Sequence, residues 1–434
     1  MPISGVTVVV GDSDVGRRVC SELARQGRRT VHLGEPSDAE LDRVLSGDID
    51  AVAVMMHDDI RALRYCLVIE HLRPEVRLSV AIFDKTVRRQ LQATIPNCVV
   101  LSPAAISVPA ITAAAVDPQA VLIMRQPRGT WQSLTDAGFV RWVLPIRLRL
   151  RSWLGVLAGQ LRPHDAGSTT LVAGALGLIL VTGIDAIIGL QHATAMRALY
   201  DAVRTTATIS APDLPDSGLL LGWASIAALL VLGFTATFGA GLVNYLLSGR
   251  HVTLIGRRVL PRSGHVIVVG MGQVGLRVAE QLRAMGIAVA GVERYDTAPT
   301  VPLARALGVP VIFGDGSSRR VLLRAGVRRA LAVVAVGSDE RDNIAVAVTA
   351  LACQQNVRVI LRAGSDDAIM ETTSLFHIGS VIDVNGLTAA FVAQALHEQL
   401  PVAAGLTASA MVLVDDQGVT RPIEAPTPLR CSCP

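Results

Sequence analysis

Residues 270–275 read GMGQVG and carry three glycines at the spacing of a dinucleotide-binding turn. In such a turn the first glycine permits the change from strand to helix, the second lets the backbone approach a pyrophosphate, and the third permits close packing of helix against strand. The start of the following helix offers N–H groups and the positive end of the helix dipole to phosphate oxygens. The motif therefore predicts a site for a phosphate-bearing nucleotide.

A second chemical signal is an acid, Glu293, which follows Gly275 by 18 residues. A carboxylate at this place, where the second strand ends, accepts hydrogen bonds from ribose hydroxyls. It favours NAD, NADH or an adenosine nucleotide such as ATP or ADP over NADP, although the neighbouring Arg294 weakens the exclusion of a 2′-phosphate. The residues leave the choice among these nucleotides open.

The elements that must position this turn lie in residues 264–385. Short apolar runs typical of buried parallel strands alternate there with amphipathic segments of helical period. Such alternation predicts a Rossmann-like, doubly wound parallel sheet. The glycine turn stands between the first strand and the first helix of the series.

The N-terminal 120 residues look like a degenerate copy of the same fold. Residues 11–16 read GDSDVG, so Ser13 replaces the central glycine and its Cβ would crowd a pyrophosphate. Glu35 could serve as the acid, but Gly34 and Pro36 beside it are typical of a loop. Further strand-like runs lie at residues 51–56, 76–82 and 98–101. We expect a structural domain here that does not bind nucleotide.

Two long apolar segments separate these domains. Residues 168–190 contain one charged side chain, Asp185, and residues 217–247 contain none. Each exceeds the roughly 20 residues that a helix needs to cross about 30 Å of hydrocarbon. A buried core helix is the alternative for each segment, but the flanking charges follow membrane rules. We therefore predict a transmembrane hairpin of two helices.

Arginines gather on one side of the predicted hairpin. Residues 125–163 hold seven arginines and one acid, and residues 248–263 hold four arginines and no acid, whereas residues 191–216 hold two arginines and three aspartates. The positive-inside rule then places both termini in the cytoplasm. The segment 121–167 mixes arginines with bulky apolar residues and is expected to be an interfacial linker along the headgroups, with a simple linker as the alternative.

Composition argues against several other classes. A formal net charge of +4 over 434 residues gives no reason to expect a nucleic-acid partner. The six cysteines lack the paired spacing of zinc ligands, so no metal site is predicted. No recognisable set of catalytic residues is present, and we do not expect an enzyme.

The segment 264–385 resembles the regulator-of-potassium-conductance (RCK) domain, also known from Trk-type potassium-uptake regulators (TrkA-N). Besides the glycine turn and Glu293, the matching features are FGD at 313–315, VLLRAGV at 321–327, GSD at 337–339 with Asn343, and VILRA at 359–363. The resemblance implies that the turn, the second-strand acid and the aspartate after the third strand line the nucleotide site, with the fifth-strand arginine near the phosphates. The residues assigned to nucleotide binding are Gly270, Met271, Gly272, Gln273, Val274, Gly275, Glu293, Asp315, Ser338 and Arg362.

The resemblance extends to the segment between the spans, because RCK domains often follow a two-span potassium channel. Residues 198–213, ALYDAVRTTATISAPD, look like the pore helix and filter ALYFSVVTLTTVGYGD and align without a gap. The filter-like residues are Thr208, Ile209, Ser210, Ala211, Pro212 and Asp213. A potassium filter turns successive carbonyl groups toward the ion, which its two glycines allow.

Both filter glycines are replaced in this chain. Pro212 stands at one of the two positions, and its φ is locked near about −65°, so it cannot take a left-handed conformation. We therefore predict a degenerate filter without strict potassium selectivity, similar in plan to the plant symbiosis-type nuclear ion channels.

Together these features predict an ion channel or channel-like membrane protein for cation transport of the potassium type, gated by NAD(H) or an adenine nucleotide bound to a cytosolic RCK ring. One pair of spans cannot enclose a pore, so we expect a homotetramer that contacts membrane lipid and a permeant cation. The expected location is the plasma membrane of a prokaryote. The alternatives are an NAD-binding regulatory subunit of a separate potassium transporter and a membrane-anchored oxidoreductase.

The predicted fold class is α/β plus membrane α, with two Rossmann-like domains flanking the hairpin and a re-entrant loop within it. The expected boundaries are a degenerate Rossmann/RCK-like domain at 1–120, a basic interfacial linker at 121–167, transmembrane helices at 168–190 and 217–247, a pore-helix and filter-like loop at 191–216, a linker at 248–263, the RCK-type nucleotide-binding domain at 264–385, and a C-terminal helix and tail at 386–434.

Overall fold

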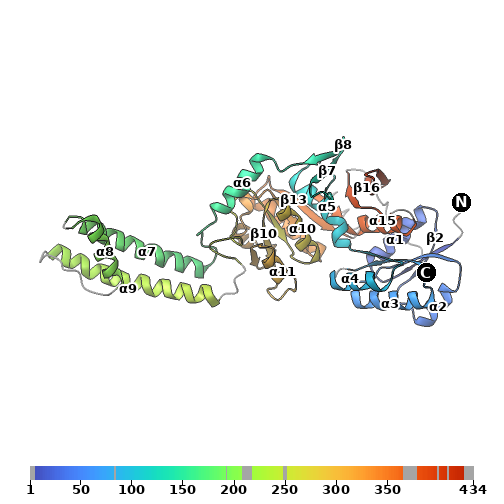
Figure 1. Cartoon of the computed structure of the whole chain (residues 1–434), viewed down its shortest axis with the longest axis horizontal. Coiled ribbons are helices and arrows are strands. Elements are labelled where there is room, and N and C mark those ends of the chain that lie inside the picture. The colour runs from blue at the N-terminus through green and yellow to red at the C-terminus, as the bar shows by residue number, and fades with distance from the viewer. Residues whose placement is uncertain are drawn as a thin grey trace. The chain divides into compact units, whose positions relative to one another are not determined.

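The computed structural model describes residues 5–82, 85–191, 193–207, 218–247, 252–364, 379–397, 400–407 and 410–424. Two units make up the chain. The α/β unit comprises residues 1–156 and 261–434, and the hairpin unit comprises residues 157–260. Figure 1 shows both units, with the Rossmann-like sheets in one and the long apolar helices in the other. The predicted fold class is confirmed in these features.

The first half of the α/β unit is a five-stranded parallel sheet in the order β2-β1-β3-β4-β5. Its elements are β1 (Val6–Val10), α1 (Asp14–Arg25), β2 (Arg29–Leu33), α2 (Asp38–Leu45), β3 (Ile49–Val54), α3 (Asp59–Leu72), β4 (Arg77–Ala81), α4 (Lys85–Thr94) and β5 (Cys98–Leu101). The central strands are runs of Val and Ala that are buried on both faces, as parallel strands covered by helices require.

The second half is a six-stranded parallel sheet in the order β11-β10-β9-β12-β13-β14. Its elements are β9 (His265–Val269), α10 (Gln273–Ala284), β10 (Ala288–Glu293), α11 (Val301–Ala306), β11 (Val311–Phe313), α12 (Arg319–Arg324), a 3₁₀ turn (Val327–Arg329), β12 (Ala332–Ala335), α13 (Glu340–Cys353), β13 (Arg358–Ala363) and β14 (Ser380–Asp383). Strand order reverses around β9, which pairs with β10 on one side and β12 on the other.

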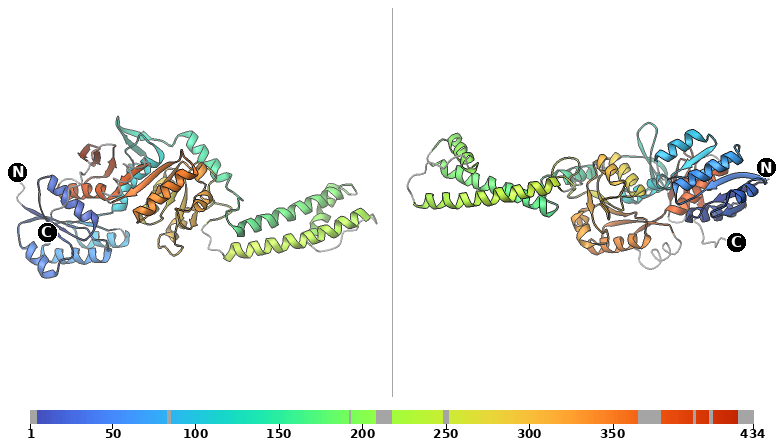
Figure 2. Two further views of the ribbon diagram at one scale, coloured as in Figure 1. Left: turned by 180° about the vertical axis from the view of Figure 1, so that it is seen from behind. Right: turned by 90° about the horizontal axis from the view of Figure 1, so that it is seen from below.

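Each half of the α/β unit lends a helix to the other half (Figure 2). Helix α5 (Pro103–Val116) follows the first sheet in sequence, yet it packs against α10 and the strands β12 and β13. Helix α15 (Val384–His397) follows the second sheet, yet it packs against α1 and the strands β3 and β4. Both helices are apolar nearly all round, as helices enclosed by protein are. The two halves therefore share one hydrophobic core.

A matched pair of arginines holds the exchanged helices in place. Arg77, the first residue of β4, donates to the carbonyl of Leu396 in α15, and Arg358, the first residue of β13, donates to the carbonyl of Ala115 in α5; both distances are 3.0 Å. A cation at the carboxyl end of a helix satisfies an unpaired carbonyl and complements the helix dipole. The equivalent contacts in both halves indicate that the two parallel-sheet halves are an internal repeat.

Two small antiparallel sheets complete the α/β unit. The segment 121–167, expected to be a linker, begins with a sheet of β6 (Leu122–Arg125), β7 (Trp131–Thr135) and β8 (Gly138–Trp142), followed by α6 (Ile146–Leu157). The tail after residue 400 forms a second sheet of β15 (Ala403–Leu406), β16 (Ala410–Val414) and β17 (Thr420–Glu424). The sheets share the apolar cluster of Leu122, Leu134, Ala403, Val412 and Val414. Residues 122–142 are therefore part of a core and not of a linker.

The hairpin unit contains two long helices, α7 (Ala166–Gly189) and α9 (Gly218–Leu247), which run antiparallel and side by side (Figure 1). With mean hydropathies of 2.3 and 2.1, both are long and apolar enough to cross a membrane. Glycines bring the two backbones close, since a Cβ built on Gly174 or Gly241 would come within 2.5 or 2.4 Å of a backbone nitrogen of the other helix. Small residues permit such close packing between membrane helices.

A shorter helix, α8 (Ala195–Thr206), packs against α7, and the hydroxyls of Thr182 and Thr206 are 2.8 Å apart. Asp185 in α7 accepts a hydrogen bond from the indole nitrogen of Trp223 in α9 at 2.7 Å. The filter-like residues 208–213 lie outside the described residues, so the re-entrant pore loop stays a prediction.

Candidate functional site

A cavity of about 490 Å³ opens at the carboxyl ends of the strands in the second sheet. Its lining comes from the β9–α10 turn and from the residues that end or follow β10, β11, β12 and β13. Open α/β sheets bind ligands in this crevice, where the strand order reverses. Its volume is also in the range of small-molecule sites, about 300–1,000 Å³.

The three glycines of the turn differ in the space that a side chain would meet at each position. Gly270 has φ of +87°, and a Cβ on it would lie 2.7 Å from the backbone nitrogen of Gly337. A Cβ on Gly275 would lie 2.0 Å from the carbonyl oxygen of Gly270. Around Gly272, by contrast, no protein atom lies within 4 Å of an added Cβ. The fold itself requires the first and third glycines, whereas the second leaves open space in the cavity.

Gly272 is also the N-cap of α10, and as a glycine it has no side chain that could accept a hydrogen bond from the N–H groups of the first turn. These groups stand at the positive end of the helix dipole. Because Gly272 and Gln273 both line the cavity, the start of α10 can receive the oxygens of a phosphate group.

Glu293 links the end of β10 to this turn. Its Oε2 accepts from the backbone nitrogen of Met271 at 2.8 Å, and its Oε1 accepts from the backbone nitrogen of Arg294 at 2.8 Å. A carboxylate offers about four lone-pair positions, so it can accept from these N–H groups and from a ribose hydroxyl together.

Arg294 joins two further acids at the cavity. Its Nη2 lies 2.9 Å from Oδ2 of Asp342 and 3.6 Å from Oδ1 of Asp315. Asp342, followed by Asp315, raises the pKa of the Arg294 guanidinium. The pKa of Asp315 is itself lowered, mainly by the backbone N–H and the hydroxyl of Ser317, which donate to its Oδ1 at 2.9 and 2.8 Å. The sequence had singled out Arg294 only as a neighbour of the acid, and gave no signal for Asp342.

The opposite wall is held by a buried amide. Asn343 accepts from the backbone nitrogen of Gly337 at 2.8 Å and donates to the carbonyl oxygens of Gly337 and Arg362 at 3.1 Å each. These hydrogen bonds join the residues that follow β12 to β13. Arg362 lines the cavity and is largely buried. This burial lowers the pKa of its guanidinium, and the negative charge of Glu340 offsets only part of that effect. A buried cation of this kind favours an anionic ligand.

The structure brings most of the predicted residues together. Those that line the cavity are Gly270, Gly272, Gln273, Val274, Glu293, Asp315, Ser338 and Arg362. Met271 is fully buried beneath the turn and contributes its backbone N–H to Glu293, while Gly275 packs against Gly270. These two residues shape the turn without lining the cavity.

The corresponding turn of the first half is satisfied by its own side chains. The hydroxyl of Ser13 accepts from the backbone nitrogen of Gly16 at 3.2 Å and donates to the carbonyl of Met55. Ser13 thus caps α1 where a phosphate would have to bind. Glu35 forms an ion pair with Arg61.

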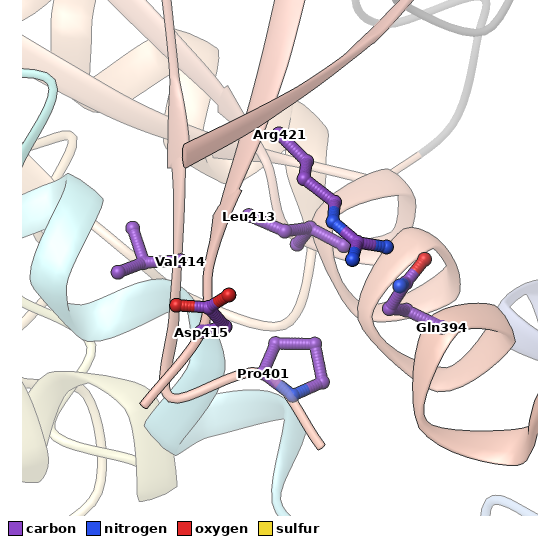
Figure 3. Close-up of a pocket in the computed structure, with 6 residues that line it drawn as sticks. All are labelled: Gln394, Pro401, Leu413, Val414, Asp415 and Arg421. Atoms are coloured by element: carbon purple, nitrogen blue, oxygen red, sulfur yellow. The ribbon is translucent and has the colours of Figure 1, made fainter. Parts of the chain in front are cut away.

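A second, smaller depression lies between α15 and the strands β16 and β17 (Figure 3). It is lined by Gln394, Pro401, Leu413, Val414, Asp415 and Arg421. Its volume of about 20 Å³ holds a water molecule but not a nucleotide. Among the described residues, no group of three or more His, Cys, Asp or Glu side chains is placed to hold a metal ion.

The parallel sheet, the glycine turn and the acid at the end of the second strand define a nucleotide-binding domain of the Rossmann class. More narrowly, residues 266–382 match the family model of the TrkA-N domain. The RCK/TrkA-N resemblance predicted from the sequence is thereby confirmed.

The curated proteins to which the chain is similar include a potassium channel and a potassium antiporter. The chain is 26% identical over 193 residues to the voltage-gated potassium channel Kch of Escherichia coli, covering 42% of this chain and 45% of Kch. It is 28% identical over 179 residues to the chloroplastic K(+) efflux antiporter 2 of Arabidopsis thaliana, covering 37% of this chain and 15% of the antiporter. The chain thus spans less than half the length of either relative.

Among solved structures, the GsuK channel has a similar fold. It superposes with a TM-score of 0.52 at 14% sequence identity, covering 91% of this chain and 64% of the GsuK chain. At this identity the likeness concerns the fold alone.

Proposed function

We propose that the chain is a subunit of a cation channel whose conductance is regulated by NAD(H) or an adenine nucleotide. The observation that carries the proposal is the presence, in one chain, of an open cavity at a glycine turn and of two helices able to cross a membrane. The relationship to Kch, a potassium channel, supports a role in potassium-type transport. In this proposal the protein is an integral protein of a prokaryotic plasma membrane with both termini in the cytoplasm.

The cavity favours a ribose that carries no phosphate on its 2′-hydroxyl. A 2′-phosphate needs a free cation beside it, and the guanidinium of Arg294 already faces the carboxylates of Asp342 and Asp315. The carboxylate of Glu293 would also repel that phosphate. These charges support NAD, NADH, ADP or ATP over NADP as the ligand.

Ligand binding can reach the membrane through the two segments that lead to and from the hairpin unit. The hydroxyl of Ser152 in α6 accepts from the backbone nitrogen of Ala288 at 3.0 Å, and the backbone nitrogen of Arg262 donates to the carbonyl of Gly155 at 2.8 Å. Both segments are therefore attached to the amino-terminal edge of the second sheet, opposite the cavity. A nucleotide that prefers one of two arrangements of this sheet would shift the position of both attachments.

Conduction requires more than one copy, because two spans cannot enclose a pore. We propose a homotetramer in which residues 198–213 line the pathway without strict potassium selectivity. The replacement of both filter glycines, one by Pro212, supports this lack of selectivity.

A nucleotide-binding regulatory subunit of a separate potassium transporter is the second candidate. The similarity to a K(+) efflux antiporter favours it, because that relative is named as a transporter and not as a channel. In both candidates the protein is a sensor and not an enzyme.

The decisive experiment records currents from the purified chain in planar bilayers with potassium or sodium, before and after addition of NAD, NADH, ADP or ATP. We expect currents that change with one of these nucleotides, and that lose this response in Gly272→Ala because its methyl group enters the cavity. Gly34→Ala is the matched control, since a Cβ there also meets no atom within 4 Å. Nucleotide binding without current would favour the regulatory subunit, and absence of both would overturn the proposal.

A further inference from the structure

Helix α6 is anchored to the α/β unit by one face. Leu148 is half-buried on that face, and Ser152 and Gly155 are buried there. A Cβ on Gly155 would lie 2.0 Å from the carbonyl oxygen of Ser263, so the helix sits directly on the returning chain. The hydrogen bonds of Ser152 and Gly155 described above fix the orientation of the helix about its own axis.

The opposite face of α6 is apolar and exposed. Ile146, Leu150, Trp153 and Leu157 follow one another at helical spacing, and at about 100° per residue they lie about 100–160° around the helix axis from Ser152. Each exposes more than half of its surface, from 51% for Leu150 to 72% for Ile146. Val143, just before the helix, is also exposed, at 60%. A continuous row of this kind marks an interaction surface.

Arginines border this stripe on both sides. By the same helical spacing Arg149 lies along one edge of the stripe and Arg147 along the other, and both are exposed. Residues 137–164 contain five arginines and no acid. Arginine side chains at such edges can lay their alkyl stems on an apolar layer and bring the guanidinium groups to phosphates above it.

We propose that α6 lies in the surface of the membrane, with its apolar stripe among the acyl chains and its arginines on the headgroups of anionic phospholipids. Charge complementarity selects this occupant, because the arginines match phosphate-bearing headgroups and have no acidic residue beside them in the segment. Chain continuity supports it, because only residues 158–165 separate α6 from the candidate membrane helix α7. The proposal rests on membrane insertion of the hairpin and does not depend on nucleotide binding.

The surface contact gives the protein a sensitivity to lipid charge. Each arginine that leaves the anionic surface should lower the ratio of docked to undocked α6 by about fivefold. Since α6 is bonded to the sheet that carries the cavity, its docking would hold that sheet at a set distance from the bilayer.

Tryptophan fluorescence of the full chain in lipid nanodiscs tests the proposal. A Trp131→Phe/Trp142→Phe/Trp223→Phe variant leaves Trp153 as the reporter of α6. A Trp131→Phe/Trp142→Phe/Trp153→Phe variant leaves Trp223, which reports insertion of α9 and serves as the control. The nanodiscs contain phosphatidylcholine with or without phosphatidylglycerol, and brominated acyl chains quench a tryptophan that reaches them.

We expect brominated lipid to reduce Trp153 emission at least about twofold when phosphatidylglycerol is present. Arg147→Gln/Arg149→Gln should weaken this quenching, whereas Arg319→Gln/Arg320→Gln, which removes the same charge from exposed positions of α12, should not. If the triple variant that keeps only Trp153 does not fold, Trp153→Phe in the otherwise native chain should remove the charge-dependent part of the quenching.

Quenching of Trp223 without quenching of Trp153 would overturn the proposal while leaving the hairpin in the membrane. If Trp153 were then also shielded from acrylamide in water, a second copy of the chain would be the occupant of the stripe. Failure of both tryptophans to be quenched would overturn membrane insertion itself, and with it both this proposal and the channel.

Discussion

The carboxylate of Glu293 accepts a hydrogen bond from the backbone nitrogen of Met271, over 2.8 Å. This bond joins the end of the second strand to the turn after the first strand, so one side chain fixes the shape of the turn and also faces the cavity. The acid that the sequence assigns to a ribose is therefore also part of the phosphate-binding turn.

Glu293→Gln should weaken NAD binding by about tenfold, or ~1.4 kcal/mol, because the amide has one accepting oxygen for the backbone donors and the ribose. Isothermal titration calorimetry would measure the loss. Glu35→Gln, at the corresponding place of the first half, is the control. Equal affinity of Glu293→Gln and the native chain would contradict the assignment of this acid.

The paired acids at Arg294 should control the choice between NAD and NADP. In Asp315→Asn/Asp342→Asn the guanidinium is released from both carboxylates, and the affinity for NADP relative to NAD should rise by about tenfold. Competition between the two nucleotides would measure this ratio. Asp38→Asn breaks a comparable exposed ion pair with Arg64 in the first half and should leave the ratio unchanged.

Two glycines of α9 should respond differently to enlargement. A side chain at Gly241 would collide with the backbone of Leu171, whereas an added Cβ at Gly239 meets no atom within 4 Å. We expect Gly241→Leu to separate the helices and lower the apparent Tm of the protein in detergent, since overpacking costs about 1–3 kcal/mol. Gly239→Leu should change the Tm little. If instead Gly239→Leu disrupts assembly, this glycine faces another copy.

The buried imidazole of His265 should make the α/β unit less stable in acid. Burial lowers the pKa of this histidine, although its Nε2 lies 2.8 Å from the carbonyl of Ala325. The unfolded chain therefore takes up a proton first as the pH falls below about 6.5, and stability is lost down to the folded-state pKa at up to about 1.4 kcal/mol per pH unit.

Thermal unfolding at pH 7.5 and at pH 5.5 would measure this effect. The Tm should fall more in the native chain than in His265→Gln, which keeps a donor for the carbonyl but does not titrate. His71→Gln, at an exposed position, should behave as the native chain does. Parallel pH profiles of all three would show that His265 is not the responsible group.

The nucleotide site was predictable because its parts are local in sequence. The glycine turn of 270–275 occupies one strand–helix connection, and its spacing alone identifies Gly270 and Gly275 as positions without room for a Cβ. Glu293 follows at the end of the next strand. By contrast, the contact of Arg294 with Asp342 joins residues brought together only by the pairing of β10, β9 and β12 in the sheet, and no local pattern encodes that distance.

The sequence did not predict which sheet each of the exchanged helices α5 and α15 packs against. The apolar character of α5 shows that it is buried, but not which sheet buries it. Arg77 and Arg358 look like ordinary charged residues at strand starts, and no sequence pattern shows that they contact Leu396 and Ala115. The short strands of β6–β8 carry too few residues to show a period, and their apolar partners in β15 and β16 lie at the far end of the chain.

The packing of α15 on the first sheet has a consequence for biosynthesis. The ribosome makes β1 to β5 early, but the helix that covers β3 and β4 is made only after both helices of the hairpin unit. Until then α1 covers β1 and β2, but β3 and β4 lack the cover of α15 and expose apolar surface during translation. Maturation of the amino-terminal half is thus coupled to completion of the carboxyl-terminal half, and a chain interrupted between them would be a substrate for chaperones or proteases.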